Sequence, residues 1–454
     1  MNRHVMSPHR RGLRRTLALV TPVLLTLAAC GSDDPDPTVG AAEPTAGTAE
    51  PGADDTAATE TTGAETGAGT DAETDAETTG GDSTATETTG THAEPSEPAE
   101  LADPITVGVV SSYTGSFGIY GDPMELAMEL RFDAASDLAG NVPVEVIYED
   151  DATDPAVAVQ KVTKLVESDG AKIVVCCVNA GSTFAVAPVL AVMGVPQLVP
   201  IANPLGLHEN PNGFVVGPSV QWYAERLGTY AAEELGDATA VVMGMDMAYG
   251  QGVAEAFTKG FTEAGGEVVS QILTPFGTLD FGSFFGSVPE ADVVFGGYAG
   301  ADAIAFVQQY EQFGLKDHTP LLGHGPLLTE LLLQAMGPAA VGTVAGFYYS
   351  STLDNAENQA FKDALAAANP ELPPSHFTAG AWATVSVLLS AIESAGADAD
   401  GEALREAVAA ANVDTPWGPI TFDADTGYVF GPTYVYEAIQ DGDRLTHNVL
   451  TTID

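Results

Sequence analysis

The hydroxyl residues Ser182 and Thr183 stand where a buried apolar run turns into an apolar helix. The run 173–178 (IVVCCV) is apolar at every position, which is typical of a strand inside a parallel sheet. Ligands of open α/β sheets bind at the carboxyl ends of such strands, because the first amides of the next helix lack intrahelical partners. We therefore expect this turn to hold a carboxylate or carbonyl group. The alternative is that Ser182 serves only as the N-cap of the helix.

Motifs of enzymatic or metal chemistry are absent from the sequence. There is no Gly-x-x-x-x-Gly-Lys-Ser/Thr loop, no His-Glu-x-x-His pair and no Gly-x-Ser-x-Gly elbow, and the eight histidines are scattered. A hydrolase would have to combine Ser182 with His324 and Asp302 across a cleft, which is a remote alternative. We therefore predict no catalytic residue, no bound metal and no cofactor.

Residues 1–30 are predicted to be a lipoprotein signal peptide. Arginines precede the apolar run 17–27, which is too short to span a bilayer comfortably, and the run ends in Leu27-Ala28-Ala29-Cys30. This tetrad resembles the lipobox of bacterial lipoproteins, which implies lipid attachment at Cys30 and anchoring in the cell membrane, facing the periplasm or extracellular space. Ordinary secretion is the alternative. The pair Arg14-Arg15 leaves open whether export follows the general or the twin-arginine route.

Residues 31–103 contain no Lys or Arg and consist mainly of Thr, Ala, Gly, Pro, Asp and Glu. Such a segment cannot bury enough apolar area to offset its chain entropy, so we predict a disordered acidic tether. The whole chain carries 63 Asp+Glu against 15 Lys+Arg, a formal charge of −48. A surface this acidic repels phosphates, which excludes nucleic acid as a partner.

From residue 104 onward, predicted strands alternate with predicted helices in two successive sets. This pattern predicts an α/β fold of two doubly wound, Rossmann-like lobes joined by a three-segment hinge. Lobe 1 would comprise 104–218 and 350–414, and lobe 2 would comprise 219–349 and 415–454. A ligand would lie in the cleft where the strand ends of both lobes face each other.

The adjacent residues Cys176 and Cys177 are predicted to be two small buried side chains. Neighbouring residues of a strand point to opposite faces, which disfavours a bond between them. A vicinal disulfide is the alternative, since an exported protein meets oxidising conditions.

Several short motifs resemble those of the branched-chain amino-acid-binding type of solute-binding protein. In this sequence they are Tyr113-Thr114-Gly115, the stretch 149–155, the stretch 246–250, Gly296-Gly297-Tyr298 and the stretch 418–423. The resemblance implies a type I periplasmic-binding fold, a monomer that closes on a small-molecule ligand, and ABC permease subunits as partners. By position, the binding residues of the family would fall on Tyr120, Ala180, Ser182, Thr183, Ala202, Asn203, Tyr249, Tyr298 and Trp382.

One departure from this family concerns the ligand. Amino-acid-binding relatives place an acidic residue after the strand that matches 320–322, whereas this chain has His324 in Gly-His-Gly-Pro. An unpaired ammonium in a closed cleft is costly, so either Asp246 or Asp302 supplies the charge or the ligand has no α-ammonium. The ligand class thus stays open among amino acids, amides and carboxylates.

Aromatic residues in the predicted strand-end loops could wall the cleft for an apolar guest. These residues are Tyr113, Phe117, Tyr120, Tyr249 and Tyr298. A domain of the same kind could also act as a tethered sensor that signals to a membrane receptor, which is the second alternative to import.

Overall fold

The computed structural model describes residues 103–134, 142–201, 206–207, 210 and 212–453. The predicted signal peptide with Cys30, nearly all of the predicted tether, and the predicted site residues Ala202 and Asn203 lie outside the described residues.

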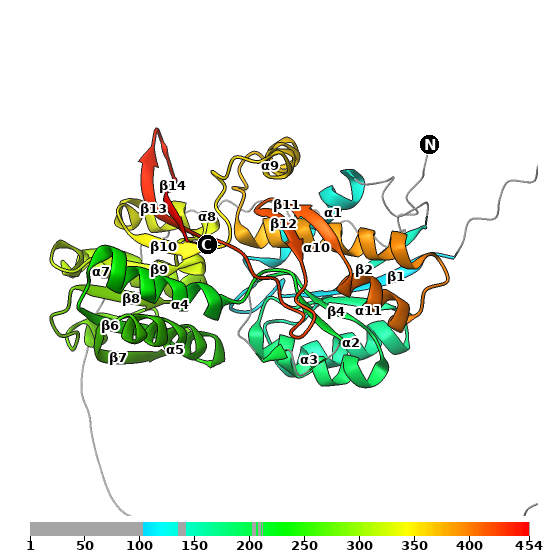
Figure 1. Ribbon diagram of the computed structural model, residues 1–454, viewed down its shortest axis with the longest axis horizontal. Coiled ribbons are helices and arrows are strands. Elements are labelled where there is room, and N and C mark those ends of the chain that lie inside the picture. The colour runs from blue at the N-terminus through cyan, green and yellow to red at the C-terminus, as the bar shows by residue number, and fades with distance from the viewer. Residues whose placement is uncertain (1–102, 135–141, 202–205, 208–209, 211, 454) are drawn as a thin grey trace, which may run out of the picture. The chain divides into compact units, whose positions relative to one another are not determined.

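The first sheet consists of five parallel strands and forms the centre of lobe 1 (Figure 1). In spatial order these are β2 (Val144–Asp150), β1 (Ile105–Ser111), β3 (Ile173–Cys176), β4 (Gln197–Val199) and β5 (Gly213–Val215). The order is that of a doubly wound sheet, in which the chain leaves the first strand in one direction and then crosses to its other side.

Helices cover both faces of this sheet. They are α1 (Gly121–Ala134) and α10 (His376–Ala395) on one face, and α2 (Pro155–Glu167) and α3 (Ala180–Met193) on the other. Val109 and Val175 pack in the core that includes α1 and α10, whereas Val174 packs against α2 and α3. This alternation explains why the central strand β3 is apolar at every position.

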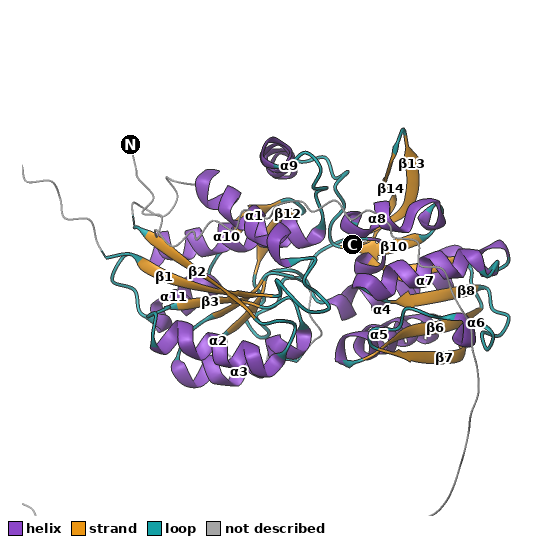
Figure 2. Ribbon diagram, turned by 180° about the vertical axis from the view of Figure 1, so that it is seen from behind, coloured by secondary structure: helices purple, strands orange, loops and turns teal. Residues whose placement is uncertain are grey.

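The second sheet forms lobe 2 and repeats the same winding (Figure 2). Its strands in spatial order are β14 (Arg444–Ile453), β13 (Thr433–Asp441), β10 (Val344–Phe347), β9 (Leu321–His324), β8 (Val293–Gly297), β6 (Thr239–Asp246) and β7 (Glu267–Pro275). The order β7-β6-β8-β9-β10 matches β2-β1-β3-β4-β5 of the first sheet. The terminal hairpin of β13 and β14 extends the sheet in antiparallel fashion.

Lobe 2 has its own helices. The longer ones are α4 (Val220–Tyr230), α5 (Ala248–Glu263), α7 (Gly300–Gln312) and α8 (Glu330–Met336). Short turns of helix lie at Ala231–Leu235, Gly282–Phe285 (α6), Leu315–Asp317, Gly325–Leu328 and Gly337–Ala340. The two sheets with their helices confirm the predicted α/β fold class.

After β10 the chain returns to lobe 1. It forms α9 (Ala356–Ala368), α10, α11 (Gly401–Ala409) and a small antiparallel pair of β11 (Asn412–Thr415) with β12 (Gly418–Thr421). By length and composition α10 could cross a membrane, but 83% of its apolar window is buried inside the folded domain. Its apolar character is therefore that of a core helix.

The last passage between the lobes lies further along the chain than the sequence predicted. We expected lobe 2 to resume at residue 415, with the stretch 417–423 on it. Instead β12 pairs with β11, Phe422 packs edge-on against Phe214 at 5.4 Å, and Tyr428 forms a β-bridge with Val215. The chain thus stays with lobe 1 as far as Tyr428 and reaches the second sheet at β13. A four-residue strand pattern does not reveal its pairing partner, which is why the boundary was misplaced.

Cys176 and Cys177 are both fully buried, but they are joined by a disulfide across a cis peptide bond. This corrects the prediction of two separate thiols. That prediction assumed regular strand geometry through both residues, whereas the strand ends at Cys176.

Candidate ligand-binding site

A cavity lies at the carboxyl ends of the strands of both sheets. Lobe 1 lines it with Phe117, Tyr120, Val178, Ala180, Ile201, His376 and Phe377. Lobe 2 lines it with Met247, Tyr249, Ala299, Pro326 and Phe347. None of these lining residues, all within the described part of the chain, carries a formal charge unless a histidine is protonated. The cavity therefore suits a small and largely apolar molecule with few polar groups.

Corresponding loops of the two lobes supply the cavity walls. Tyr120 follows β1 in lobe 1, and Tyr249 follows β6, the equivalent strand of lobe 2. Ala180 follows β3, and Ala299 follows the equivalent β8. The repeated winding thus brings like segments to face each other at the switch points of the two sheets, where ligands of such folds bind.

The two lobes touch beside the cavity. The Gly300 amide of lobe 2 donates a hydrogen bond of 3.0 Å to the Tyr120 hydroxyl of lobe 1. The Phe117 ring packs on Phe276 of lobe 2 with centroids 5.6 Å apart. These contacts describe a closed arrangement in which both lobes can reach the same guest.

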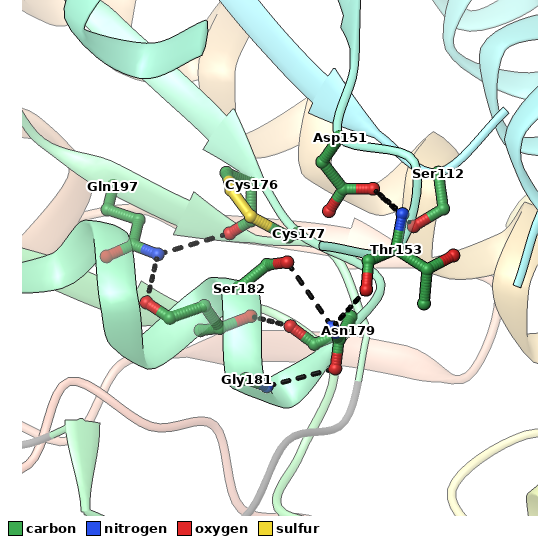
Figure 3. Close-up of a disulfide and its surroundings, with 10 residues drawn as sticks. Ser112, Asp151, Thr153, Cys176, Cys177, Asn179, Gly181, Ser182 and Gln197 are labelled. Atoms are coloured by element: carbon green, nitrogen blue, oxygen red, sulfur yellow. Dashed lines mark hydrogen bonds between the residues drawn. A yellow bond between two sulfur atoms is a disulfide. The ribbon is translucent and has the colours of Figure 1, made fainter. Parts of the chain in front are cut away.

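The loop that carries Phe117 and Tyr120 is braced by the turn after β2. The Ser112 hydroxyl donates to the Asp151 carboxylate at 2.7 Å, and the Phe117 amide donates to the Thr153 hydroxyl at 3.2 Å (Figure 3 shows Ser112, Asp151 and Thr153). Thr153 has a φ of 62°, in the left-handed region that is rare for a β-branched residue. Such local strain is sustained where the surrounding contacts hold a loop in one functional position.

Asn179, not Ser182, caps helix α3. The Asn179 side chain accepts from the Gly181 amide at 3.0 Å and donates to the Thr153 carbonyl at 3.2 Å (Figure 3). Ser182 and Thr183 lie in the first turn but are fully buried, and the Thr183 hydroxyl donates to the Asn179 carbonyl. Of the residues predicted in this turn, only Ala180 lines the cavity. Ser182 and Thr183 support the turn from behind.

Tyr249 and His324 form a hydrogen-bonded pair at the lobe 2 wall. The Tyr249 hydroxyl lies 2.6 Å from His324 Nε2. Burial lowers the pKa of His324 to about 3, an effect that the nearby Gly296 carbonyl only partly offsets. The imidazole is therefore neutral at physiological pH. His324 thus stands where the resemblance to amino-acid-binding proteins predicts an acidic residue.

His376 and Phe377, which sequence reasoning missed, begin helix α10 at the cavity. Ser375 and Thr378 form a capping box that fixes this start. Phe377 stacks on Tyr120 with ring centroids 3.8 Å apart. The Ser-x-x-Thr pattern before a long apolar run was the available signal for the helix start, but it does not show that the start faces a ligand.

Besides Ser182 and Thr183, six predicted or candidate residues lie outside the cavity lining, namely Tyr113, Asp246, Tyr298, Asp302, His324 and Trp382. Tyr298 is fully buried in the lobe 2 core, where it stacks on Phe306. The Asp302 carboxylate accepts from the Gly277 amide, and the Asp246 carboxylate accepts from Gln251. Trp382 donates to Glu357 within lobe 1, six residues beyond the point where α10 meets the cavity.

The catalytic combination of Ser182, His324 and Asp302 does not form. Ser182 lies beside Asn179, His324 bonds Tyr249, and Asp302 binds the loop after β7. Within the described residues no group of three or more His, Cys, Asp or Glu could hold a metal ion.

Comparison with known proteins agrees with this architecture. The family model described as "Periplasmic binding protein" matches residues 104–443. The Leu/Ile/Val-binding protein BraC3 of Rhizobium johnstonii is 31% identical over 334 residues, which is 71% of this chain and 88% of that protein.

Two solved structures are also similar. An ABC transporter substrate-binding protein from Sphaerobacter thermophilus has a TM-score of 0.72 and 30% identity, covering 77% of this chain and 98% of that one. An ABC transporter solute-binding protein from R. palustris, solved in complex with benzoate, has a TM-score of 0.70 and 27% identity, covering 76% and 96%. The fold is thus of the type I periplasmic-binding kind, and the chain belongs to the periplasmic binding protein family.

Proposed function

We propose that this chain is a lipid-anchored, extracytoplasmic solute-binding protein that captures a small amino acid, amide or carboxylate and delivers it to an ABC importer. The observation that carries the proposal is the cavity shared by the strand ends of both lobes, with the Tyr120–Gly300 hydrogen bond beside it. A ligand that contacts both lobes stabilises the arrangement in which the lobes are closed on it.

The names of the relatives support two ligand classes. The Rhizobium johnstonii protein is named for leucine, isoleucine and valine, and the R. palustris protein was solved with benzoate. A small amino acid with an apolar side chain or a small aromatic acid would each match the apolar character of the cavity lining.

A thermal-shift screen tests the binding function. A compound that binds only the folded state raises its melting temperature, by an amount that grows with ligand concentration over Kd. We expect at least one member of a panel of amino acids, aromatic and aliphatic carboxylates and short amides to do so. A flat response across the whole panel would overturn the proposal.

The lipid anchor is tested separately at Cys30. The Cys30→Ser variant should leave the membrane fraction and appear in the soluble extracytoplasmic fraction, because a single side chain is the predicted attachment point. Its melting temperature after purification should equal that of the wild-type domain. Membrane retention of the variant would show that another element anchors the chain.

A further inference from the structure

The second passage between the lobes, residues 348–355, is bound by both lobes at one residue, Ser351. The Ser351 amide donates a hydrogen bond of 2.9 Å to the Glu330 carboxylate, which belongs to α8 of lobe 2. The Ser351 carbonyl accepts from the Lys362 ammonium at 3.1 Å and from the Asn358 side chain at 3.3 Å, and both of these donors belong to α9 of lobe 1. The two backbone groups of one residue are therefore held by different lobes.

The partner of Ser351 in lobe 2 is fixed in position. Glu330 is 5% exposed, and its Oε1 atom lies 3.3 Å from Nδ1 of His447 in β14. His447 is itself buried, and its Nε2 atom lies 2.7 Å from the Leu328 carbonyl oxygen, which can only accept. The imidazole ring also stacks on Tyr436 with ring centroids 4.1 Å apart. A carboxylate enclosed in this way moves with lobe 2 as a rigid part of it.

The partners of Ser351 in lobe 1 are also well anchored. Asn358 is fully buried, and its Oδ1 atom accepts from the Tyr349 hydroxyl at 3.1 Å. The Asn358 amide group donates a further hydrogen bond of 2.7 Å to the Leu353 carbonyl. One side chain of α9 thus binds the passage before and after Ser351, and Lys362 adds a positive charge at the Ser351 carbonyl.

The other two passages are bound differently, because their contacts with the two lobes lie on separate residues. In the first passage, 216–219, the Val216 amide donates to a carbonyl of β4 in lobe 1, and Ser219 caps α4 in lobe 2. In the third passage, 429–432, the Val429 amide donates to a carbonyl of β5 in lobe 1, and the Gly431 carbonyl accepts from an indole of α4. These passages have intervening residues over which they can bend, whereas at Ser351 there are none.

We propose that Ser351 is the pivot of the second passage and that Glu330 fixes this pivot to lobe 2. Between the Ser351 amide and the Ser351 carbonyl the chain has only two soft torsions, the φ and ψ angles of that residue. If both groups stay bound while the lobes open, the motion of this passage is a rotation about those two bonds. Without Glu330 the bend would spread along the passage, and the closed arrangement of the lobes would become looser. The inference concerns lobe motion, goes beyond the proposed function and holds for any ligand.

Hydrogen–deuterium exchange with residue-level mass spectrometry on the unliganded full-length protein tests this inference. The Gly300 amide reports lobe opening, because it donates to the Tyr120 hydroxyl of the other lobe and, as the first residue of α7, has no partner within its helix. The Ser351 amide reports its bond with Glu330. The Val294 amide donates to the Pro320 carbonyl and reports whether the lobe 2 sheet stays intact.

In the wild type, opening of the lobes breaks the hydrogen bond of Gly300 but not that of Ser351. After correction for intrinsic chemical rates, we expect the Ser351 amide to exchange at least about tenfold more slowly than the Gly300 amide. Equal rates would show that Ser351 is released whenever the lobes open, and they would overturn its role as a pivot.

Glu330→Leu tests the part played by the carboxylate. Exchange of the Ser351 amide should become about tenfold faster or more, since a hydrogen bond to a charged acceptor is lost. Exchange at Gly300 should become about threefold faster, and exchange at Val294 should not change. Glu330→Gln keeps an acceptor oxygen and should restore part of the protection at Ser351. An unchanged rate at Gly300 in Glu330→Leu would overturn the role of Glu330.

Gln334→Leu is the matched control on the same helix, since the Gln334 side chain donates to the Leu445 carbonyl of β14 and not to the passage. It should leave the rates at Ser351 and Gly300 unchanged, and a change equal to that of Glu330→Leu would overturn the inference.

Lys362→Met covers the case in which Glu330→Leu unfolds lobe 2, seen as faster exchange at Val294. Lys362 is half-buried on α9 and binds the Ser351 carbonyl from lobe 1. Lys362→Met should therefore speed exchange at Gly300 about threefold without any change at Val294. An unchanged Gly300 rate in this variant would overturn the proposed pivot.

Discussion

At the scale of single residues, the binding surface depends on a few polar atoms set in apolar walls. The hydroxyls of Tyr120 and Tyr249 each have a protein partner, Gly300 and His324 respectively. Each partner fixes the direction in which the hydroxyl presents its remaining hydrogen-bonding capacity. A fixed hydroxyl selects among guests better than a freely rotating one, because less conformational freedom is lost on binding.

Two of the tyrosines predicted from the sequence, Tyr249 and Tyr298, should differ in their effect on ligand affinity. Tyr249→Phe should weaken binding of the preferred ligand about tenfold, since it removes a hydrogen bond of 2.6 Å and leaves buried His324 without that partner. Tyr298→Phe should lower stability only slightly and leave affinity unchanged, because Tyr298 packs in the lobe 2 core. Calorimetric titration of both variants checks this. Equal losses of ligand affinity in the two variants would show that Tyr298 belongs to the binding site.

The buried histidines predict how stability depends on pH. The folded-state pKa of His324 is lowered to about 3 by burial, and that of His376 lies well below 6.5. Between pH 6.5 and these values the unfolded chain binds more protons than the folded chain, so acidification favours unfolding. Each histidine should cost about 1 kcal/mol of stability between pH 7 and pH 5.5.

Urea unfolding of the wild type and His376→Gln at both pH values isolates this effect from the many carboxylates. The variant should lose less stability on acidification than the wild type does. An identical loss in the two proteins would show that His376 titrates normally in the folded state.

At the scale of elements, the loops after β1 and β2 form one unit that supports the cavity wall. Gly115 has a φ of 79°, and a Cβ atom there would lie 2.3 Å from the Ala152 carbonyl oxygen. Gly115→Ala should therefore lower stability by roughly 1–3 kcal/mol and also weaken ligand binding, because Phe117 and Tyr120 lie on the same loop.

Gly170→Ala is the matched control for this change. Gly170 also has a positive φ, of 74°, but a Cβ atom there meets nothing within 4 Å. It should cost about 1 kcal/mol for the backbone conformation alone and leave binding unaltered. Denaturation midpoints and ligand titrations of the two variants check this prediction. Equal losses of affinity in the two variants would refute the supporting role of the loop.

The element pattern was predictable from sequence because buried parallel strands and capped helices have strong local signals. Asp154-Pro155 marks the start of α2, and the structure shows Asp154 as its N-cap. Tyr120, Ala180 and Tyr249, which the resemblance put forward as binding residues, line the cavity, and their role in binding stays a prediction. His376 and Phe347 were missed, because they reach the cavity from the returning helix and from a strand of the other lobe. Such convergence depends on tertiary packing, which no local pattern encodes.

At the scale of the whole molecule, ligand affinity includes the free energy of closing two lobes. Interlobe contacts outside the cavity contribute to that closure, and Phe276 makes one of them with Phe117. Phe276 is 38% exposed and is not part of the cavity lining. An aromatic pair of this kind is worth about 0.5–1.5 kcal/mol, or roughly two- to tenfold in affinity.

Phe276→Ala should therefore weaken ligand binding by that factor without touching the ligand. Small-angle scattering should show a larger radius of gyration for the unliganded variant than for the unliganded wild type. Phe313→Ala is the control, since Phe313 is also exposed but packs on Phe285 within lobe 2. A similar loss of affinity in both variants would argue against a role for the interlobe contact.

The uncharged cavity lining has a consequence for the kinetics of capture. The protein as a whole carries a formal charge of −48, so an incoming carboxylate, one of the proposed ligand classes, meets long-range repulsion before it reaches the cavity. At physiological ionic strength, dissolved ions screen repulsion between charges that lie more than about 8 Å apart. Contacts inside the cavity are screened much less, because they are buried. Added salt should thus speed the entry of an anion and leave its escape nearly unchanged. Capture by this protein would then improve in salty surroundings, the reverse of ordinary electrostatic steering.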